Sequence, residues 1–359
     1  MEARQLISIL TLNRAFSNYP PVQTECSTFS EAFYGLLPET SRLDIAVGYI
    51  SGDSLIELQK ILEFNPKIRT LNLIIGMHYF DLFTRPQYET ALGLNDFLIH
   101  EGRGEVRLVN AFRYHGKLYL YRNEEGAFAG IIGSDNLNSI VDDGIHQYES
   151  SVLLREPAPV NQMSNFITRL IDTSSKNITE LKIDTFNTQN MLLEGQEHVE
   201  KVSTSRLADA VNKRTGVSFK IPIKTTPKSN LNVFFGKGRE SRNGLVKPRH
   251  WYEVELIVPN SVTSMVGYPD HNGSDKEFTV ITDDGWSFKC KVSGDHSKNF
   301  RSSGDLKILG RWLKGRLENA GALQMGTPVT QQTLQLYGRD NFTLTKTSEE
   351  GLWLLDFGV

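Results

Sequence analysis

The sequence predicts two domains of different class: an α/β domain, followed by a mainly-β barrel or sandwich. The chain has 359 residues, more than one typical core accommodates. Strand-like and helix-like stretches alternate up to residue 155. Beyond residue 206, short strand candidates are separated by turns rich in Gly, Asn, Asp and Ser.

In the first domain, the alternation predicts a mixed sheet covered by helices on both faces. Strands are predicted at 43–51, 71–76, 106–109, 112–121, 128–132 and 152–154. A helix is predicted at 54–64, and a closing helix at 159–176 begins at or near Pro159, where a missing N–H costs nothing. The following stretch is polar and mixed. We therefore expect the first domain at 1–178, a linker at 179–204 and the second domain at 205–359.

The second domain is predicted to hold five short strands and one helix. The strands are expected at 251–258, 277–281, 287–292, 343–347 and 352–357, and the helix at 304–318. Helical spacing would place Lys307, Arg311 and Lys314 along one basic stripe. The opposite, apolar side of this helix is expected to pack onto the barrel.

Composition excludes several classes of protein. The formal net charge is −3, so any signal for nucleic acid must be local. The two cysteines, Cys26 and Cys290, argue against a disulfide framework and a cysteine-based zinc site. Residues 1–18 lack the apolar core of a secretory signal, and no apolar run approaches the length of a membrane span. We therefore expect a soluble, cytoplasmic protein.

The most informative stretch runs from residue 112 to 138. Because side chains alternate along a strand, one face of the predicted strand would carry Arg113, His115, Lys117, Tyr119 and Tyr121. His115 and Lys117 would then project side by side. The next strand delivers the loop Gly133-Ser134-Asp135-Asn136, and a third strand begins near Glu149.

Together these residues suit phosphoryl transfer. A neutral imidazole, His115, can attack phosphorus, and Lys117 would supply positive charge to the phosphate oxygens. Ser134 and Asn136 would add hydrogen-bond donors, and Glu149 could hold the second nitrogen of His115. Each residue alone has an ordinary explanation, such as a solvated His–Lys pair, a turn or a surface carboxylate. The joint pattern H-x-K, G-S-x-N and a carboxylate on successive strands favours a site.

This arrangement resembles the phospholipase D superfamily, whose H-x-K…G-S-x-N motif matches His115, Lys117, Gly133, Ser134 and Asn136. The resemblance covers about residues 40–155. It implies a phosphohistidine on His115, protonation of the leaving group by a second histidine, release by water and no metal. The family often has Asp five residues after the Lys, where this chain has Arg122. For that reason we assign the carboxylate role to Glu149.

A single motif copy per chain implies a homodimer with one composite site, because the reaction needs two histidines. Two partial matches, His296-Ser297-Lys298 and Gly273-Ser274-Asp275-Lys276, are interpreted as coincidences in turns. The His115 of one subunit would attack, and that of the other would act as general acid.

A local basic run supplies the signal for nucleic acid. Residues 201–249 hold twelve basic and two acidic residues, a net charge of +10. Such a run is either a solvated, flexible face or a surface that follows phosphates. A second cluster lies at 289–301. As DNA-binding candidates we take Lys213, Arg214, Lys237, Arg239, Arg242, Asn243, Lys247, Arg249, Lys298, Asn299 and Arg301.

The stretches 251–259, 278–292 and 297–315 resemble the C-terminal domain of NgoFVII/NgoAVII-type restriction endonucleases, which are related to BfiI. The resemblance implies a B3-like pseudobarrel that reads a short double-stranded DNA target in the major groove, in a bacterial system with a DNA methyltransferase and, in some cases, a separate ATPase. This chain has no G-x-x-x-x-G-K-[ST] run and would not hydrolyse ATP itself.

The resemblance makes a metal-independent restriction endonuclease subunit the leading hypothesis. Two alternatives stay open: a phospholipase or other phosphodiesterase, and a catalytically silent DNA-binding regulator.

Overall fold

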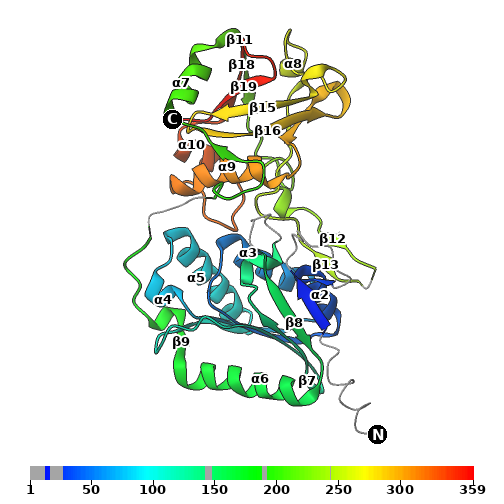
Figure 1. Cartoon of the computed structure of the whole chain (residues 1–359), viewed down its shortest axis with the longest axis vertical. Helices are drawn as coiled ribbons and strands as arrows, with labels where there is room; N and C mark the ends of the chain where they lie inside the picture. The colour runs from blue at the N-terminus through cyan, green and yellow to red at the C-terminus, as the bar shows by residue number, and fades with distance from the viewer. Residues whose placement is uncertain (1–12, 17–26, 142–147, 188–191, 243) are drawn as a thin grey trace. The chain divides into compact units, whose positions relative to one another are not determined.

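The computed structural model describes residues 13–16, 27–141, 148–187, 192–242 and 244–359 (Figure 1). The start of the chain, Cys26 and Asn243 lie outside these ranges. The chain divides into two compact units. Unit 1 comprises residues 1–189 and the hairpin Arg239–Pro248, and unit 2 comprises residues 190–238 and 249–359. No described helix combines the length and apolar character needed to cross a membrane.

Unit 1 is built on a nine-stranded mixed sheet with the order β2-β1-β8-β7-β6-β3-β4-β5-β9. The strands are β1 Asn13–Phe16, β2 Ser27–Thr28, β3 Arg42–Val47, β4 Thr70–Ile75, β5 Gly104–Val109, β6 Lys117–Asn123, β7 Gly126–Gly133, β8 Ser150–Leu154 and β9 Ser175–Asn177. Strands β3, β4 and β5 are parallel, whereas β6 is antiparallel to β3 and β7. This confirms the predicted α/β domain with a mixed sheet.

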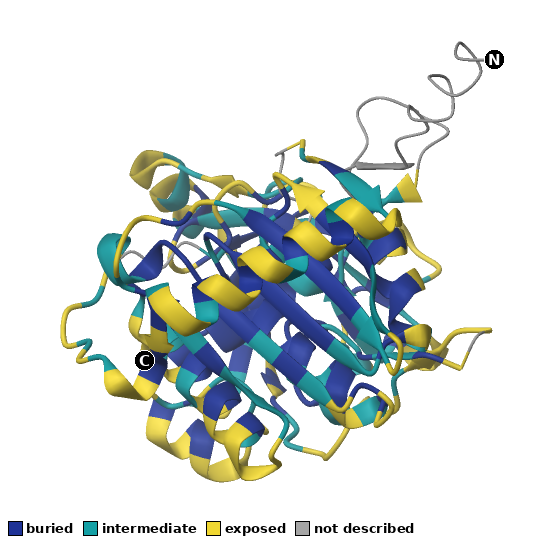
Figure 2. Cartoon of the chain, turned by 90° about the horizontal axis from the view of Figure 1, so that it is seen from below, coloured by how far each residue is buried: buried dark blue, intermediate teal, exposed yellow. Residues whose placement is uncertain are grey.

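Helices cover both faces of this sheet (Figure 1). The helices are α2 Phe29–Leu36, α3 Gly52–Phe64, α4 His78–Asp81, α5 Arg85–His100 and α6 Pro157–Arg169. Helices α2, α3 and α5 lie on one side, and α6 crosses the other side with its exposed residues turned outward (Figure 2). The closing helix thus begins at Pro157 instead of Pro159 and gives way to a π-helical turn, Leu170–Ser174.

Strand β6 lies at the centre of the sheet and is buried on both faces. Tyr119 and Tyr121 enter one hydrophobic core, and Leu118 and Leu120 enter the other. The predicted strand 112–121 is wrong in its first half, because β6 begins only at Lys117. Before that point the chain is diverted toward β4, where the Tyr114 N–H donates to the Gly76 carbonyl.

The far end of β3 carries a buried carboxylate, Asp44, whose side chain is completely covered. It accepts hydrogen bonds from Arg122 Nε at 2.8 Å, from Arg42 Nε at 3.0 Å and from Asn72 Nδ2 at 2.7 Å. Arg122 also donates to Ser164 of α6 at 2.9 Å. Arg122, which departs from the phospholipase D pattern, therefore has a structural role at the end of β6 remote from Lys117.

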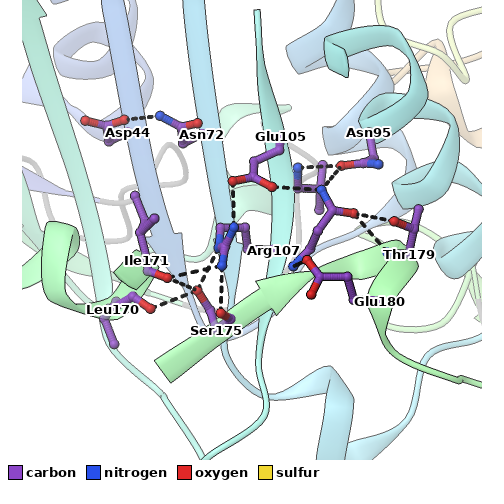
Figure 3. A network of polar contacts seen from close by, with 12 residues as sticks. Asp44, Asn72, Asn95, Glu105, Arg107, Leu170, Ile171, Ser175, Thr179 and Glu180 are labelled. Carbon is purple, nitrogen blue, oxygen red and sulfur yellow. Dashed lines mark hydrogen bonds and ion pairs between the residues drawn. The ribbon is translucent and has the colours of Figure 1, made fainter. Parts of the chain in front are cut away.

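A second polar network attaches the edge strand β9 to β5 and α5 (Figure 3). Asn177 donates to Asn95 at 3.1 Å and to Glu105 at 2.8 Å. The Arg107 guanidinium donates to the Ser175 carbonyl at 2.7 Å and pairs with Glu105 at 2.6 Å. These buried and half-buried polar groups are hydrogen-bonded to one another, so they fix the register of a strand only three residues long.

Unit 2 is a mainly-β, curled sheet, as predicted. Its strand order is β11-β18-β19-β15-β16-β17-β14, with β10 paired to β16. The strands are β10 Glu200–Lys201, β11 Arg214–Pro222, β14 Leu256–Ile257, β15 Glu277–Thr282, β16 Trp286–Ser293, β17 Asn299–Ser302, β18 Asn341–Thr347 and β19 Leu352–Asp356, and the helices are α7 Thr204–Asn212, α8 Asn260–Thr263, α9 Lys307–Asn319 and α10 Gln331–Tyr337. The predicted strand 251–258 is reduced to β14, and β11 was missed.

The predicted basic stripe on the helix now identified as α9 is wrong, because Arg311 and Lys314 are buried. The Lys314 Nζ donates to the Trp251 carbonyl at 2.6 Å and lies 3.7 Å from the centre of that indole ring. Burial lowers the pKa of Lys314 to about 7, against the opposing effect of Glu318. Helical spacing shows which residues share a face of α9, but it does not show whether that face is exposed or buried.

The hairpin formed by β12 Arg239–Glu240 and β13 Val246–Lys247 packs within unit 1. Leu245 is 6% exposed and joins the core that contains α2 and α3. The Asn65 amide forms two hydrogen bonds with the backbone of Val246, at 2.9 and 3.0 Å. Lys247 lies 4.4 Å from the centre of the Tyr34 ring. A segment distant in sequence thus completes one side of unit 1.

The Asp44 cluster gives a testable prediction about stability. Asp44→Ala should lower the free energy of unfolding by about 3–5 kcal/mol, because it leaves the half-buried Arg122 without its carboxylate. Arg42→Ala is the matched control: its side chain is 42% exposed, and its loss should cost less than about 1 kcal/mol. Urea denaturation of the full chain measures both. Equal losses for the two variants would contradict the role assigned to Asp44.

Candidate functional site

The catalytic candidates lie together where the ends of strands β6, β7 and β8 meet, on one side of the unit 1 sheet. Lys117 begins β6 and pairs with Val47, the last residue of β3. Gly133 ends β7 and pairs with Ser151, near the start of β8. Because neighbouring strands run in opposite directions, the start of β6, the end of β7 and the start of β8 meet at this edge.

His115 and Lys117 lie together although only Lys117 belongs to a strand. His115 is exposed, whereas Lys117 is 5% exposed. The Lys117 Nζ donates to the His115 carbonyl at 2.7 Å and lies 3.1 Å from Nδ1 and 3.2 Å from Nε2 of the ring. Burial lowers the pKa of Lys117, and the Glu149 carboxylate opposes this effect. The site therefore presents an accessible imidazole beside a fixed, poorly hydrated amine.

The loop after β7 is drawn tightly against β8. A Cβ at Gly133 would lie 2.1 Å from Ser151 Oγ and 2.4 Å from the Ser150 carbonyl oxygen, so only glycine allows this approach. The Ser134 Oγ accepts a hydrogen bond from Ser150 N at 3.0 Å. Ser134 is exposed at the edge where Lys117 begins β6. Its hydroxyl is thus held at a fixed place on the rim of the site.

Tyr49 is a site residue that sequence reasoning missed. Its backbone N–H donates to Asn136 Oδ1 at 3.1 Å, and its ring packs edge-on against His115, with centres 5.6 Å apart. The residue therefore joins the two halves of the motif. Correct pairing of β3 with β6 would have pointed to Tyr49, because this residue lies just beyond β3 and beside the start of β6.

Glu149 lies close enough to act electrostatically on Lys117. Within the described part of one chain it forms no hydrogen bond with His115. The two nitrogens of the His115 ring are almost equally distant from Lys117 Nζ, so Lys117 does not select a tautomer. The role of Glu149 in orienting His115 stays a prediction.

Asp135, the variable position of the G-S-x-N loop, is a buried carboxylate. It is 1% exposed and accepts a hydrogen bond from Ser151 at 2.5 Å. Its backbone carbonyl accepts from the Tyr119 hydroxyl at 2.9 Å. Burial raises the pKa of Asp135 to about 6, against the opposing hydrogen bond from Ser151. The loop is therefore anchored from beneath by a group that titrates in a mildly acidic range.

Comparison with known families covers both units. Residues 29–183 match the NgoFVII restriction endonuclease N-terminal PLD domain, and residues 209–348 match the NgoFVII C-terminal B3-like DNA-binding domain. The chain belongs to the NgoFVII restriction endonuclease family. The first match holds His115, Lys117, Ser134, Asn136 and Glu149.

Two solved structures show a weak similarity to part of the chain. A phosphatidylserine synthase from Haemophilus influenzae Rd KW20 is 17% identical over 48% of this chain and 41% of its own, with a TM-score of 0.34. Nuc, a phospholipase D family member from Salmonella typhimurium, is 9% identical over 46% of this chain and 97% of its own, with a TM-score of 0.31. The chain thus spans less than half of the synthase. No curated protein matches the sequence.

The basic run divides between the two units. Arg239, Arg242 and Lys247 belong to the hairpin of unit 1, where Arg239 and Arg242 are exposed. In unit 2, Arg214 and Lys237 are exposed.

Two further candidates of unit 2 are engaged in ion pairs. Lys213 pairs with Asp209 at 2.8 Å and with Glu349 at 3.1 Å. Arg249 pairs with Glu253 at 2.5 Å. A phosphate would have to compete with these carboxylates for both cations.

The second basic cluster is carried by β16, β17 and the turn between them. Pairing of these strands sets Arg301 opposite Lys291 and Asn299 opposite Ser293. Lys298 and Asn299 follow a turn in which His296 and Ser297 have left-handed backbone angles, with φ of 56° and 54°. Ser297 is 5% exposed and accepts from His271 N at 2.9 Å, so the turn is well fixed.

The two partial motif copies both lie in short 3-10 turns of unit 2, Ser274–Lys276 and Asp295–Ser297. This agrees with their interpretation as coincidences. Among the described residues, no group of three or more His, Cys, Asp or Glu side chains could hold a metal ion.

The raised pKa of Asp135 predicts a specific pH dependence of stability. The protonated Asp135 carboxyl stabilises the folded state. This contribution to the free energy of unfolding is fully present below the ordinary pKa of 3.8 and is lost as the pH rises through about 6. The loss amounts to about 3 kcal/mol. In urea denaturation between about pH 4 and pH 7, Asp135→Asn should remove this decline, and Asp172→Asn, at an exposed position, should retain it. Parallel curves for the Asp135→Asn variant and the wild type would refute the assignment.

Proposed function

We propose that the protein is a site-specific deoxyribonuclease that hydrolyses phosphodiester bonds of double-stranded DNA without a metal, through a phosphohistidine on His115. The observation that carries this proposal is the exposed His115 ring beside the buried Lys117 Nζ, at 3.1–3.2 Å from both ring nitrogens. A phosphate that approaches the ring would meet the amine at once. Membership of a restriction endonuclease family and a second, DNA-binding domain support DNA as the substrate.

The reaction proceeds in two steps, formation of a phosphohistidine and its hydrolysis. A ring nitrogen of His115 forms a bond to phosphorus, the bond to one deoxyribose oxygen breaks, and that oxygen takes a proton from a second histidine. Water then attacks the phosphohistidine, gives its proton to the second histidine and frees the His115 ring. Lys117, Ser134 and Asn136 neutralise and orient the phosphate oxygens in both steps.

The second histidine is provided by a second copy of the chain. Each chain carries a single H-x-K…G-S-x-N motif, and the two partial copies lie in turns of unit 2. Phe112, next to the motif, is 46% exposed, and Ile132, next to Gly133, is 44% exposed. Large apolar side chains exposed around a catalytic edge are suited to burial between subunits.

The β16–β17 face of unit 2 is proposed to contact the DNA target. Lys298 and Arg301 would bind phosphates, and Asn299, at the start of β17 next to a fixed turn, has the side-chain type that pairs with base edges. The protein would act in the bacterial cytoplasm beside a cognate methyltransferase and, where ATP is used, a separate ATPase subunit.

Catalysis by His115 gives the central prediction. In the presence of a metal chelator, the wild type should cleave DNA, and His115→Ala should lower the rate by about a thousandfold or more. His100→Ala, at an exposed position of α5, is the control and should retain the wild-type rate. Dimers mixed from wild-type and His115→Ala subunits should also be inactive, because the composite site needs both rings.

Two outcomes would refute this mechanism: cleavage that depends entirely on added magnesium, and full activity of His115→Ala. Turnover of phosphatidylcholine in place of DNA would identify a phospholipase instead.

The DNA contacts make a second prediction, measured on the full chain carrying His115→Ala so that the target stays intact. Asn299→Ala should weaken binding to the target by about 1–3 kcal/mol and leave non-specific binding unchanged. Lys298→Ala should weaken binding to the target and to non-specific DNA. It should also reduce the slope of the logarithm of the binding constant against the logarithm of the salt concentration by about one. Lys67→Ala, at an exposed position in unit 1, serves as control. Equal effects of Asn299→Ala on target and non-specific DNA would remove Asn299 from base recognition.

A further inference from the structure

Tyr49 is held at three points around the catalytic edge. Its backbone N–H donates to Asn136 Oδ1 at 3.1 Å. Its ring lies edge-on to the His115 imidazole, at 5.6 Å between centres and 77° between planes. Its hydroxyl donates to Asp81 Oδ2 at 2.7 Å.

The contact with Asn136 determines which end of that amide faces the substrate. An amide has one acceptor oxygen and one donor nitrogen, and here the oxygen is engaged by the Tyr49 N–H. The Nδ2 group, which carries two donor hydrogens, is left for a phosphate oxygen. Tyr49 therefore fixes the orientation in which Asn136 can serve as a donor.

The contact with His115 limits where the imidazole can lie. A Cβ at Gly48 would be 3.3 Å from Cδ2 of His115 and 3.4 Å from its Cα, so His115 packs directly on the backbone before Tyr49. The Tyr49 ring then covers a second side. An exposed imidazole would otherwise sample several rotamers, so these two contacts reduce the freedom of the attacking group.

The Tyr49 ring is itself clamped from outside. Asp81 accepts from the Tyr49 hydroxyl with one oxygen and forms an ion pair with Arg113 through the other. On another side of the ring lies His78, edge-on at 5.4 Å between centres. His78 is fixed in turn, because Nε2 accepts from Ile50 N at 3.2 Å and Nδ1 lies 3.1 Å from the Leu82 carbonyl.

The protonation states of this clamp suit a fixed support. The hydrogen bond to Asp81 raises the pKa of Tyr49, and the same bond lowers the pKa of Asp81. Near neutral pH the phenol is therefore a neutral donor and the carboxylate an ionised acceptor. Such a charge-assisted hydrogen bond is about twice as strong as one between neutral groups.

We propose that Tyr49 is the positioning residue of the hydrolytic site: its ring, clamped by Asp81, holds the His115 imidazole in the attacking orientation while its backbone N–H turns the Asn136 amide nitrogen toward the phosphate. This inference rests on the proposed function of His115. It assigns no bond-making step to Tyr49, which acts through its two neighbours.

Turnover of bis(p-nitrophenyl) phosphate by the full chain, in a metal chelator, tests the proposal without involving DNA recognition. Tyr49→Ala should lower kcat about 10- to 100-fold and change KM by less than about twofold, because a misplaced ring slows attack without weakening substrate binding. Tyr49→Phe keeps the ring and should stay within about threefold of the wild-type kcat. Tyr79→Ala, which removes a half-buried ring of α4, is the matched control and should leave kcat unchanged.

A spectroscopic readout separates positioning from a loss of folding. The His115 ring protons should be shifted in the proton spectrum by the adjacent Tyr49 ring. This shift should persist in Tyr49→Phe and disappear in Tyr49→Leu, which keeps apolar volume at this position. Melting temperatures of all variants identify any that fail to fold.

The outcomes separate the two hypotheses. If neither the wild type nor His115→Ala hydrolyses the diester, the proposed function fails, and the ring-proton shift alone decides whether Tyr49 holds His115. If the wild type is active and folded Tyr49→Ala or Tyr49→Leu matches its kcat, the positioning role is overturned. Equal damage by Tyr49→Phe and Tyr49→Ala would likewise overturn it, because the ring would then not be the group that matters.

Discussion

The site depends on one constraint: the Lys117 amine is held in a buried position at the start of the central strand β6. Lys117 is the first residue of a strand that is covered on both faces, so its side chain cannot swing out into solvent as an ordinary surface lysine does. Its bond to the His115 carbonyl ties the preceding loop to the strand. Desolvation makes the amine a stronger partner for an anion than a hydrated amine would be, and the closure of β7 against β8 at Gly133 places hydroxyl and amide donors on the same edge.

Opposite ends of the same strand serve different purposes. At one end β6 presents Lys117 to the site, and at the other Arg122 meets the buried Asp44 and reaches Ser164 of α6. The departure from the phospholipase D pattern at Arg122 therefore has a structural explanation at the end of β6 remote from the site. An arginine at this position anchors α6 to the sheet, and the sheet holds Lys117 in place. One strand therefore carries both a buried structural ion pair and the candidate site lysine.

In unit 2, burial decided the role of each charge more than sequence clustering did. Arg311 and Lys314 follow one face of a helix, yet both are enclosed, and Lys314 rests on the Trp251 ring and carbonyl. Lys213 is paired with Glu349 from a distant part of the chain, and Arg249 is paired with Glu253, four residues further along. The run between residues 201 and 249 is even shared between the units, because Leu245 is drawn into the core of unit 1. A basic run in the sequence indicates a possible phosphate-binding surface, but it does not indicate which of its basic side chains are accessible to a phosphate.

The fold class, the family and the candidate pair His115 and Lys117 could be inferred from the amino-acid sequence, because hydrophobic periodicity and the H-x-K and G-S-x-N spacings are local properties of the chain. The same periodicity placed nine of the nineteen described strands within a few residues, but the short strands at the sheet edges, β11 and β17 were not predicted. Three features became known from the three-dimensional structure alone: His115 lies in a loop before its strand, Tyr49 joins His115 to Asn136, and the 239–248 hairpin completes unit 1. Each of these depends on contacts between residues far apart in sequence. Such contacts follow from strand pairing and burial, which no local pattern specifies.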